Sequence, residues 1–267
     1  MYESYWGLNE KPFENTPDPR FLFLSSEHLE ALTRLIYIVE ELKGATLLTG
    51  EYGCGKTVLS RLLFEKLSPD KYNVALLTNP MLDPTELLEE ICFQLGVESK
   101  ETSSKTQLLR DLNDSLYRNM KNSKGTIIIV DEAQAIKNEQ AFEELRLLLN
   151  FQLNDRFLLT LILIGQPELR EMIGKMKQFK QRISMQYHLN PLNSNDSAKY
   201  ITHRLKVAGV RRKIFTDDAV KIIWGHANGV PRVMNTICDT CLLTGLSMKV
   251  LEINEGIAGK AIQYLDQ

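Results

Sequence analysis

The stretch from Gly50 to Thr57 constrains this chain more than any other. It reads Gly-Glu-Tyr-Gly-Cys-Gly-Lys-Thr and matches the P-loop pattern Gly-x-x-x-x-Gly-Lys-Thr. The apolar run 45–49 before it predicts a buried strand, and the valine and leucines after it recur at helical spacing. The order of strand, glycine-rich loop and helix therefore predicts a phosphate-binding site rather than an ordinary glycine turn.

The residue types in this loop suit a nucleotide. Backbone N–H groups from Gly53 to Thr57 can converge on a phosphate, and glycine allows the close approach. We expect Lys56 to reach the β- and γ-phosphates of ATP and the Thr57 hydroxyl to ligate Mg²⁺. The other loop residues expected to contact the nucleotide are Gly50, Glu51, Tyr52, Cys54, Gly55 and Val58.

Composition narrows the class of protein. The chain has 267 residues, of which 43% are hydrophobic and 25% charged, as in an ordinary globular protein, and its net charge of −2 gives no global basic field. The first four residues lack the basic start and apolar core of a secretory signal, and the apolar run 157–165 is far shorter than the ~20 residues that span a bilayer. Together with four cysteines, which suggest reduced thiols, these features predict a cytoplasmic protein.

Strand and helix patterns alternate through the first part of the chain. Buried strands are predicted at 45–49, 74–77, 126–130, 157–164 and 184–189, with helical patterns between them, which indicates a parallel sheet with helices on both faces. After Pro191 only helical patterns remain, at 196–208, 217–227, 232–247 and 255–265. We therefore predict an α/β core over residues 1–190 and an all-α domain over 191–267.

The first 26 residues form an unusual segment. Aromatic residues alternate with prolines, which predicts an extended arm that packs on the domain following it, with or without contact to the nucleotide. Ser26 is the expected N-cap of the next helix. Further on, the polar segment 98–105 is predicted to be a loop.

Asp131 and Glu132 complete the nucleotide signal. They follow the β-branched run Thr126–Val130, and carboxylates at the carboxyl end of a buried strand point into the ligand crevice of such sheets. Asp131 is expected to hold Mg²⁺, directly or through water, and Glu132 to orient and activate the attacking water. The alternative is a strand that ends in surface polar residues.

Three further residues are candidates with open alternatives. Gln166 ends the neighbouring strand and could sense the γ-phosphate, or be a turn residue before Pro167. Arg232 begins a helix, where the dipole disfavours a cation, so a phosphate is the expected partner. Arg182 could reach into the site of a neighbouring subunit and stabilise the charge on the γ-phosphoryl group. Arg170 is a second candidate for that role. The alternative for both residues is a solvent-exposed side chain without such a role.

Weaker features have ordinary explanations. Cys238 and Cys241 have C-x-x-C spacing within an apolar helical pattern, which favours packing in a core. Cys54 is either oxidation-sensitive, because helix N-termini favour thiolate, or a small filler of the loop. The four histidines show no ligand spacing. The basic clusters 175–180 and 211–213 could touch nucleic acid or be solvated faces.

Together these residues resemble an AAA+ ATPase. In that resemblance Gln166 corresponds to the sensor-one residue, Arg182 to the arginine finger and Arg232 to the sensor-two arginine. Longer motifs are similar to the general secretion pathway A, or ExeA-like, family and to mannose-sensitive pilus biogenesis ATPases: Tyr5–Leu8, Lys11–Phe13, Pro17–Arg20, Ser26 with His28, Val130–Gln134, Gly165–Leu169 and Gly229–Arg232. The resemblance covers nearly the whole chain.

The resemblance implies a fold and an activity. It implies a P-loop three-layer αβα core with a small all-α C-terminal lid, ATP and Mg²⁺ as cofactors, and a nucleotide-dependent homo-oligomer. Hydrolysis would be coupled to assembly of a secretion or type IV pilus-like apparatus. Secretin-assembly members carry a transmembrane helix and a peptidoglycan-binding domain after the ATPase, and neither follows Leu265 here. We therefore expect either action through a membrane-protein partner or a stand-alone ATPase, placed in the cytoplasm or at the inner membrane.

Two other functions stay open from the sequence. The same ATPase type resembles DNA-associated regulators of transposition, and the basic clusters would then bind duplex DNA. Alternatively, the chain is a slow nucleotide-gated switch, in which ATP closes the helical lid and exposes a partner surface.

Overall fold

The computed structural model describes residues 1–98 and 104–266 of the chain. Their contacts divide them into two compact units. Unit 1 contains Met1–His28, Glu51–Val58 and the segment from Asn190, and unit 2 contains Leu29–Gly50 and Leu59–Leu189. Most of the predicted loop 98–105 lies outside the described residues.

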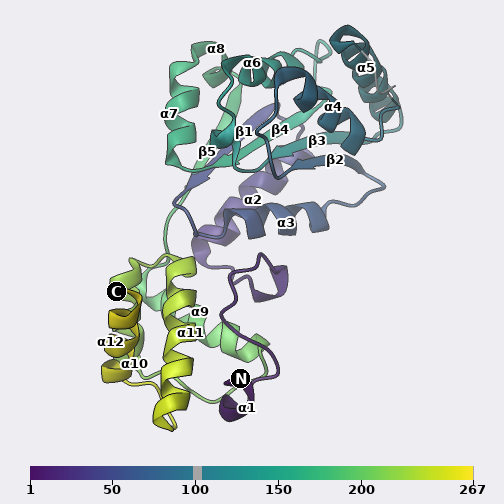
Figure 1. The fold of residues 1–267 in the computed structure, drawn as a ribbon. Helices are drawn as coiled ribbons and strands as arrows, with labels where there is room; N and C mark the ends of the chain where they lie inside the picture. The colour runs from purple at the N-terminus through teal and green to yellow at the C-terminus, as the bar shows by residue number, and fades with distance from the viewer. Residues whose placement is uncertain (99–103, 267) are drawn as a thin grey trace. The chain divides into compact units, whose positions relative to one another are not determined.

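Unit 2 is built on a five-stranded sheet in the order β2-β3-β4-β1-β5, in which every pair of neighbours is parallel (Figure 1). The strands are β1 (Ala45–Gly50), β2 (Tyr72–Leu77), β3 (Gly125–Val130), β4 (Thr160–Gly165) and β5 (Ile183–Leu189). Since parallel strands run the same way, the residues that follow β1, β3 and β4 all leave from one edge of the sheet. That edge is where ligands bind in open α/β sheets.

Helices cover both faces of this sheet, as Figure 1 shows, with α2 and α3 on one face and α4, α5, α6 and α7 on the other. Their bounds are α2 (Ser26–Glu40), α3 (Lys56–Lys66), α4 (Pro84–Gln94), α5 (Lys105–Lys121), α6 (Glu139–Leu148), α7 (Pro167–Lys175) and α8 (Lys177–Lys180), with a 3₁₀ turn η2 (Ala133–Ala135) after β3. The expected α/β class with a parallel sheet is therefore confirmed.

The inner strand β3 shows why the sheet needs two helical layers. Ile128 and Val130 belong to the apolar cluster that includes side chains of α4, α5 and α6. Ile127 and Ile129 are buried as completely, and alternation along a strand directs them to the other face. A strand buried on both faces is hydrophobic at every position, which is why the sequence pattern identified it.

Unit 1 has a helical core of its own. It contains α9 (Ser194–Val207), α10 (Asp217–Ala227), α11 (Pro231–Met248) and α12 (Glu255–Leu265), close to the predicted ranges. Thr216 caps α10 by accepting a hydrogen bond from the Ala219 N–H, 3.2 Å away, and Asn254 caps α12 in the same way. Local cap chemistry therefore sets the starts of these two helices.

The N-terminal arm packs differently from the prediction. It carries a short helix α1 (Glu3–Trp6) and a 3₁₀ turn η1 (Pro19–Phe21), and its buried aromatic side chains share one core with α9 to α12. The Trp6 indole donates a hydrogen bond to the Leu242 carbonyl, 2.9 Å away, and Arg204 donates to the carbonyls of Pro12 and Glu14. The expectation that the arm packs on the domain following it was wrong, because aromatic content predicts burial but not against which surface.

Two local expectations shift by a few residues. The Ser25 hydroxyl, rather than that of Ser26, accepts the His28 N–H at the start of α2, at 3.3 Å. Strand β4 begins at Thr160, because Phe157 instead forms an isolated antiparallel bridge with Gln152.

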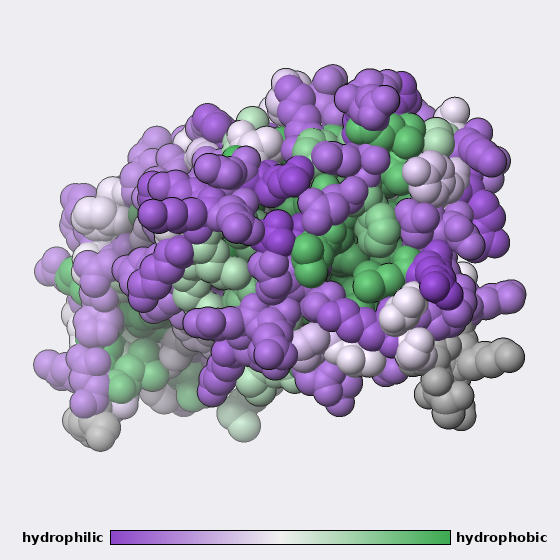
Figure 2. Space-filling model, turned by 90° about the horizontal axis from the view of Figure 1, so that it is seen from above, coloured by the Kyte–Doolittle hydropathy of each residue, from purple (hydrophilic) through white to green (hydrophobic). Residues whose placement is uncertain are grey.

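In the view of Figure 2 most side chains are hydrophilic, and the largest area of hydrophobic ones lies right of the centre. Single large apolar side chains of unit 2, such as Met81 and Phe93, are exposed. Exposure of this kind is ordinary for a globular protein. Within the part of the chain that the structure describes, no helix has both the length and the apolar character needed to cross a membrane.

Candidate functional site

The P-loop follows β1 directly and leads into α3, which begins at Lys56. Gly53 and Gly55 have φ values of +86° and +95°, a left-handed conformation that residues with a Cβ adopt at a cost. The loop closes on itself, because the Cys54 N–H donates to the Glu51 carbonyl at 3.2 Å and the Lys56 ammonium donates to the same oxygen at 3.0 Å. Thr57 and Val58 follow in the first turn of α3, both half-buried. A helix N-terminus preceded by such a loop is a ready anion site.

Arg232 lies against the P-loop within unit 1. Its backbone N–H donates to the Gly53 carbonyl at 3.3 Å, and its guanidinium carbon lies 4.7 Å from the centroid of the Tyr52 ring. A Cβ added to Gly53 would lie only 2.6 Å from the Cβ of Arg232. The residue is the second of α11 and is exposed, so its cationic end is available to a phosphate held by the loop.

Cys54 is a filler of the loop. It is 1% exposed, and burial raises the pKa of its thiol to about 11 although Lys56 acts in the opposite direction. The thiol is therefore protonated at neutral pH, and an oxidation-sensitive thiolate, one of the two alternatives from the sequence, is not favoured.

Asp131 stands at the carboxyl end of β3 in unit 2, and its residue is 1% exposed. Its backbone N–H donates to the Leu77 carbonyl at 2.8 Å, and one of its carboxylate oxygens accepts the Glu132 N–H at 2.9 Å. The other oxygen accepts the Ser60 hydroxyl at 3.4 Å. These bonds fix the direction in which the Asp131 carboxylate points.

Glu132 is held by a residue that the sequence analysis overlooked. Its backbone is in the left-handed region, with φ of +52°. The Gln134 side-chain amide donates a hydrogen bond to the Glu132 carboxylate, and its carbonyl oxygen accepts the Gln166 N–H at 3.0 Å. Gln134 therefore links Glu132, two residues past β3, to Gln166, the residue directly after β4. Its place in the Val130–Gln134 motif was the only signal in the sequence.

Gln166 occupies the N-cap position of α7, directly before Pro167. Its side chain makes no capping hydrogen bond, so its amide is not used to start the helix. Gly165 before it must be glycine, since a Cβ there would lie 2.4 Å from the Gln134 side-chain oxygen. Asp131, Glu132 and Gln166 thus lie at one edge of the sheet in unit 2, on neighbouring strands.

Thr57 and Asp131 carry oxygen atoms of the kind that bind magnesium in nucleotide sites, where one or two protein oxygens commonly act together with phosphates and water. Thr57 belongs to unit 1 and Asp131 to unit 2, so each is a candidate by its own chemistry. Among the described residues, no group of three or more His, Cys, Asp or Glu side chains could hold a metal ion.

Arg182 lies at the opposite edge of the sheet. It directly precedes β5, whose first residue pairs with Ala45 at the start of β1, whereas Asp131 follows the end of β3. Its guanidinium donates to the Asn150 side-chain oxygen at 3.1 Å. A strand of this length is about 20 Å long from its first to its last residue. Arg182 lies at the beginning of the strands and Asp131 at their end, so the two residues of one chain cannot contact each other. Arg170 is exposed in the first turn of α7, on the Gln166 side.

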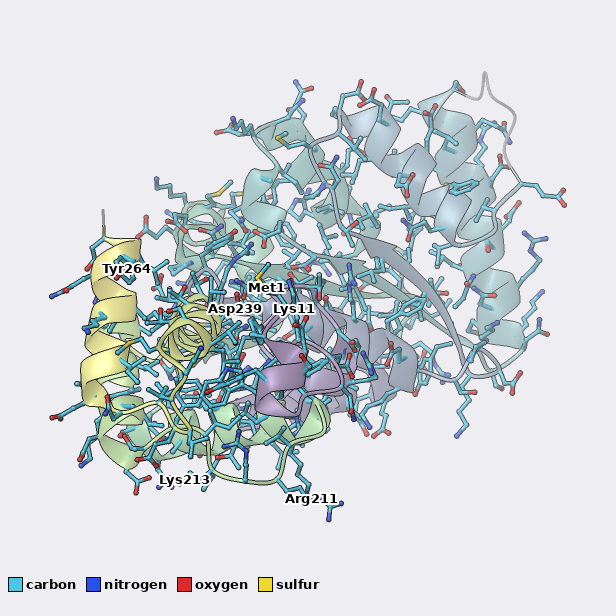
Figure 3. All side chains as sticks on the ribbon, turned by 60° about the horizontal axis from the view of Figure 1, so that its bottom comes forward. Met1, Lys11, Arg211, Lys213, Asp239 and Tyr264 are labelled. Carbon is cyan, nitrogen blue, oxygen red and sulfur yellow. The ribbon has the colours of Figure 1, made fainter. Side chains whose placement is uncertain are left out.

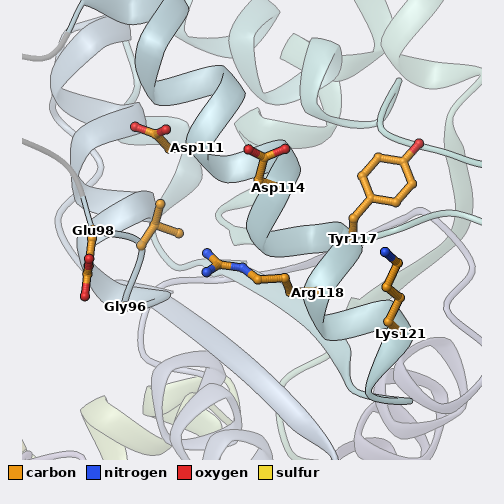
Figure 4. A pocket seen from close by; sticks show the side chains of 8 residues that line it. Gly96, Glu98, Asp111, Asp114, Tyr117, Arg118 and Lys121 are labelled. Atoms are coloured by element: carbon orange, nitrogen blue, oxygen red, sulfur yellow. The ribbon is translucent and has the colours of Figure 1, made fainter.

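Two further features of the described residues are not candidate sites. Cys238 and Cys241 are fully buried free thiols of the unit 1 core, and burial raises the pKa of Cys241 to about 12. In unit 2, a cavity of about 770 Å³ lies beside α5 (Figure 4). Acidic and basic side chains of α5 line it together with Glu98, the last described residue before the gap, and we assign it no ligand.

Comparison with known proteins identifies the family. An AAA domain family matches residues 39–173, half of the chain, and this match contains the P-loop, Asp131, Glu132 and Gln166. The chain belongs to the AAA family. This AAA protein is also 38% identical over 249 residues to the general secretion pathway protein A of Aeromonas hydrophila, across 92% of its own length. It spans 45% of that relative, less than half.

Solved structures support the AAA fold. The Aeropyrum pernix ORC2 protein, in ADPNP and ADP complexes, superposes with a TM-score of 0.65 at 18% identity, over 90% of this chain and 67% of that one. The A. pernix ORC1 protein in complex with DNA gives a TM-score of 0.66 at 17% identity, over 89% and 65%. At such identities the likeness shows the fold alone.

Proposed function

We propose that this chain is a Mg-dependent ATPase that binds ATP with its P-loop and hydrolyses it. The observation that carries the proposal is the loop itself, with Gly53 and Gly55 left-handed and Lys56 at the start of α3. We also propose residues 1–190 as the nucleotide-binding region and 191–267 as the lid, with the arm packed on the lid helices.

The proposed roles follow from residue chemistry. The loop N–H groups and Lys56 hold the β- and γ-phosphates, and Arg232 adds a cation for the phosphate charge. Thr57 and Asp131 would hold Mg²⁺, which supplies charge neutralisation at the phosphates. Glu132 accepts a proton from the attacking water as that water bonds to the γ-phosphorus; the bond from this phosphorus to the bridging oxygen breaks, and ADP and inorganic phosphate leave. Gln166 contacts the γ-phosphate or the water.

The cellular role we propose is assembly of a secretion or type IV pilus-like apparatus. It is supported by the 38% identity to a general secretion pathway protein over 92% of this chain. Under this proposal the chain forms a nucleotide-dependent homo-oligomer, meets a membrane-protein partner, and works in the cytoplasm or at the inner membrane. Arg182, far from its own chain's Asp131 along the sheet, would complete a neighbouring subunit's site.

The test combines turnover with particle size. We expect phosphate release from Mg-ATP by the purified chain, its loss in Glu132→Gln with ATP binding retained, and a larger particle with a non-hydrolysable ATP analogue than with ADP. Glu143→Gln, at a half-buried carboxylate of α6 that pairs with Arg146, is the matched control and should hydrolyse normally. Undiminished phosphate release in Glu132→Gln would reject the assigned role. Tight ATP binding without turnover in the wild type would favour the nucleotide-gated switch instead.

A DNA-associated regulator is the second candidate. Arg211, Arg212 and Lys213 line a groove of about 610 Å³ in unit 1, and Figure 3 shows Arg211 and Lys213 projecting outward from the ribbon. Arg212 is already engaged, since it donates to the Leu251 carbonyl at 3.0 Å. This function predicts salt-sensitive duplex binding that requires ATP and is lost in Arg211→Ala. Assembly that does not respond to added duplex DNA would favour the secretion role.

A further inference from the structure

A buried histidine outside the P-loop contacts its backbone. The Nε2 atom of His28, in the first turn of α2, lies 3.0 Å from the Cys54 carbonyl oxygen, in the middle of the loop. On the other side of the ring, Nδ1 lies 2.7 Å from the Ser25 hydroxyl. Ser25 and His28 are each only 2% exposed, so water does not compete for these bonds. All three residues belong to unit 1.

The partners determine which ring nitrogen carries the hydrogen. A carbonyl oxygen only accepts, so Nε2 must be the donor to Cys54. Nδ1 is then the acceptor, and the Ser25 hydroxyl donates to it. The same hydroxyl accepts the backbone N–H of His28, at 3.3 Å, which holds Ser25 in place. Ser25 thus selects the ring form that donates toward the loop.

Holding one carbonyl orients the next amide. In a trans peptide the C=O of Cys54 and the N–H of Gly55 point in opposite directions, because the peptide unit is planar. With the carbonyl directed at His28, the Gly55 N–H is directed away from it. Gly55 has φ of +95°, and a Cβ at this position would lie 3.1 Å from Nε2 of His28, so imidazole and loop are in direct contact.

We propose that His28 is a positioning residue for the P-loop: by holding the Cys54 carbonyl it presents the Gly55 N–H to the phosphates of the nucleotide. The inference rests on the proposed ATP site and deepens it. Burial lowers the pKa of His28, so the ring is neutral at pH 7. Its contribution is therefore the direction of a peptide group and not an added positive charge, which distinguishes it from Lys56 and Arg232.

The experiment measures nucleotide affinity of the full chain with Mg²⁺ by calorimetry. We expect His28→Leu to bind ATP and ADP about tenfold more weakly, a loss of about 1.4 kcal/mol, with AMP affinity unchanged because AMP lacks the outer phosphates. His28→Gln, whose amide can still donate to Cys54, should recover most of the affinity. The matched control is His226→Leu, a partly exposed histidine of the same unit, which should bind as the wild type.

Two results would overturn the proposal, and a third would instead contradict the proposed function on which it rests. Wild-type ATP affinity in a folded His28→Leu variant, or an equal loss for ATP and AMP, rejects a phosphate-positioning role. If that variant does not fold, nitrogen NMR of the wild-type ring decides: the Nε2–H form supports the proposal, and the Nδ1–H form rejects it. If the wild type itself does not bind ATP, the proposed function fails.

Discussion

The side-chain amide of Gln134 donates a hydrogen bond to the carboxylate of Glu132. The same side chain accepts the N–H of Gln166 at 3.0 Å, so the proposed base and the proposed sensor are linked through one residue. The bond fixes where the Glu132 carboxylate points, and a proton acceptor for water must be placed within hydrogen-bond reach.

We expect Gln134→Leu to keep ATP binding but to hydrolyse about tenfold more slowly, because Glu132 loses its orienting bond and effects of this size follow misplacement of a catalytic group. KM should change little. In Gln134→Glu the orienting amide donor is replaced by a like charge beside the Glu132 carboxylate, so turnover should fall at least as far as in Gln134→Leu. A normal kcat in either variant would contradict this link.

Gly53 should not tolerate a side chain. Its φ of +86° strains any residue with a Cβ, and that Cβ would lie 2.6 Å from the Cβ of Arg232. We expect Gly53→Ala to lower the free energy of unfolding by about 1–3 kcal/mol and to abolish measurable ATP binding. Gly259→Ala is the control, since this glycine lies within α12 with open space around its Cα and alanine is the better helix former. Denaturant unfolding measures the first effect and calorimetry the second. Wild-type ATP affinity in Gly53→Ala would contradict the proposal that this loop binds the nucleotide.

Arg182 should act on a neighbouring subunit. We expect Arg182→Ala to bind ATP normally but to lose turnover, because the cation that stabilises γ-phosphoryl charge is missing. Mixing Arg182→Ala with Glu132→Gln should restore part of the activity, since sites made from the Glu132 of one variant and the Arg182 of the other are complete. Arg170→Ala serves as the competing variant. Normal kcat in Arg182→Ala would reject this role for Arg182. Full loss of turnover in Arg170→Ala but not in Arg182→Ala would assign the role to Arg170.

Folding stability should fall as the pH drops below about 6.5. Burial lowers the pKa of His28 beneath its ordinary value of 6.5, although the Cys54 carbonyl, Glu27 and Asp196 act in the opposite direction. Below pH 6.5 the unfolded chain binds a proton at this position and the folded chain does not, so protons favour unfolding. Urea unfolding from pH 8 to pH 5.5 should show this loss, and His28→Gln should reduce it. An unchanged pH slope in that variant would speak against the shift. Burial also lowers the pKa of His203, so His203→Gln is the matched comparison.

The arm should be essential to the helical unit. Trp6 is 1% exposed and donates its indole hydrogen bond to the Leu242 carbonyl of α11. Trp6→Ala should cost about 3–5 kcal/mol of unfolding free energy, through lost burial and a cavity. Tyr264→Ala, an exposed aromatic on α12, should cost far less. Equal unfolding midpoints for the two variants would show that the arm is dispensable.

Much of the fold could be predicted from the sequence because the signals are local. All five strands lie where apolar, β-branched runs indicated them, and the starts of α10 and α12 follow from Thr216 and Asn254. The P-loop was recognisable because its residues are contiguous. Asp131 and Glu132 were recognisable because a carboxylate directly after a buried strand has few other uses.

The sequence by itself determined the parallel α/β class, the P-loop and the carboxylates at the end of β3. Only the tertiary structure decided that Arg232 meets Gly53, that His28 holds Cys54, and that the arm shares a core with α9 to α12. It also placed the Gln134 amide between Glu132 and Gln166. The physical reason is range: propensity, periodicity and capping act over a few residues, whereas contacts between distant segments depend on how whole helices and strands pack.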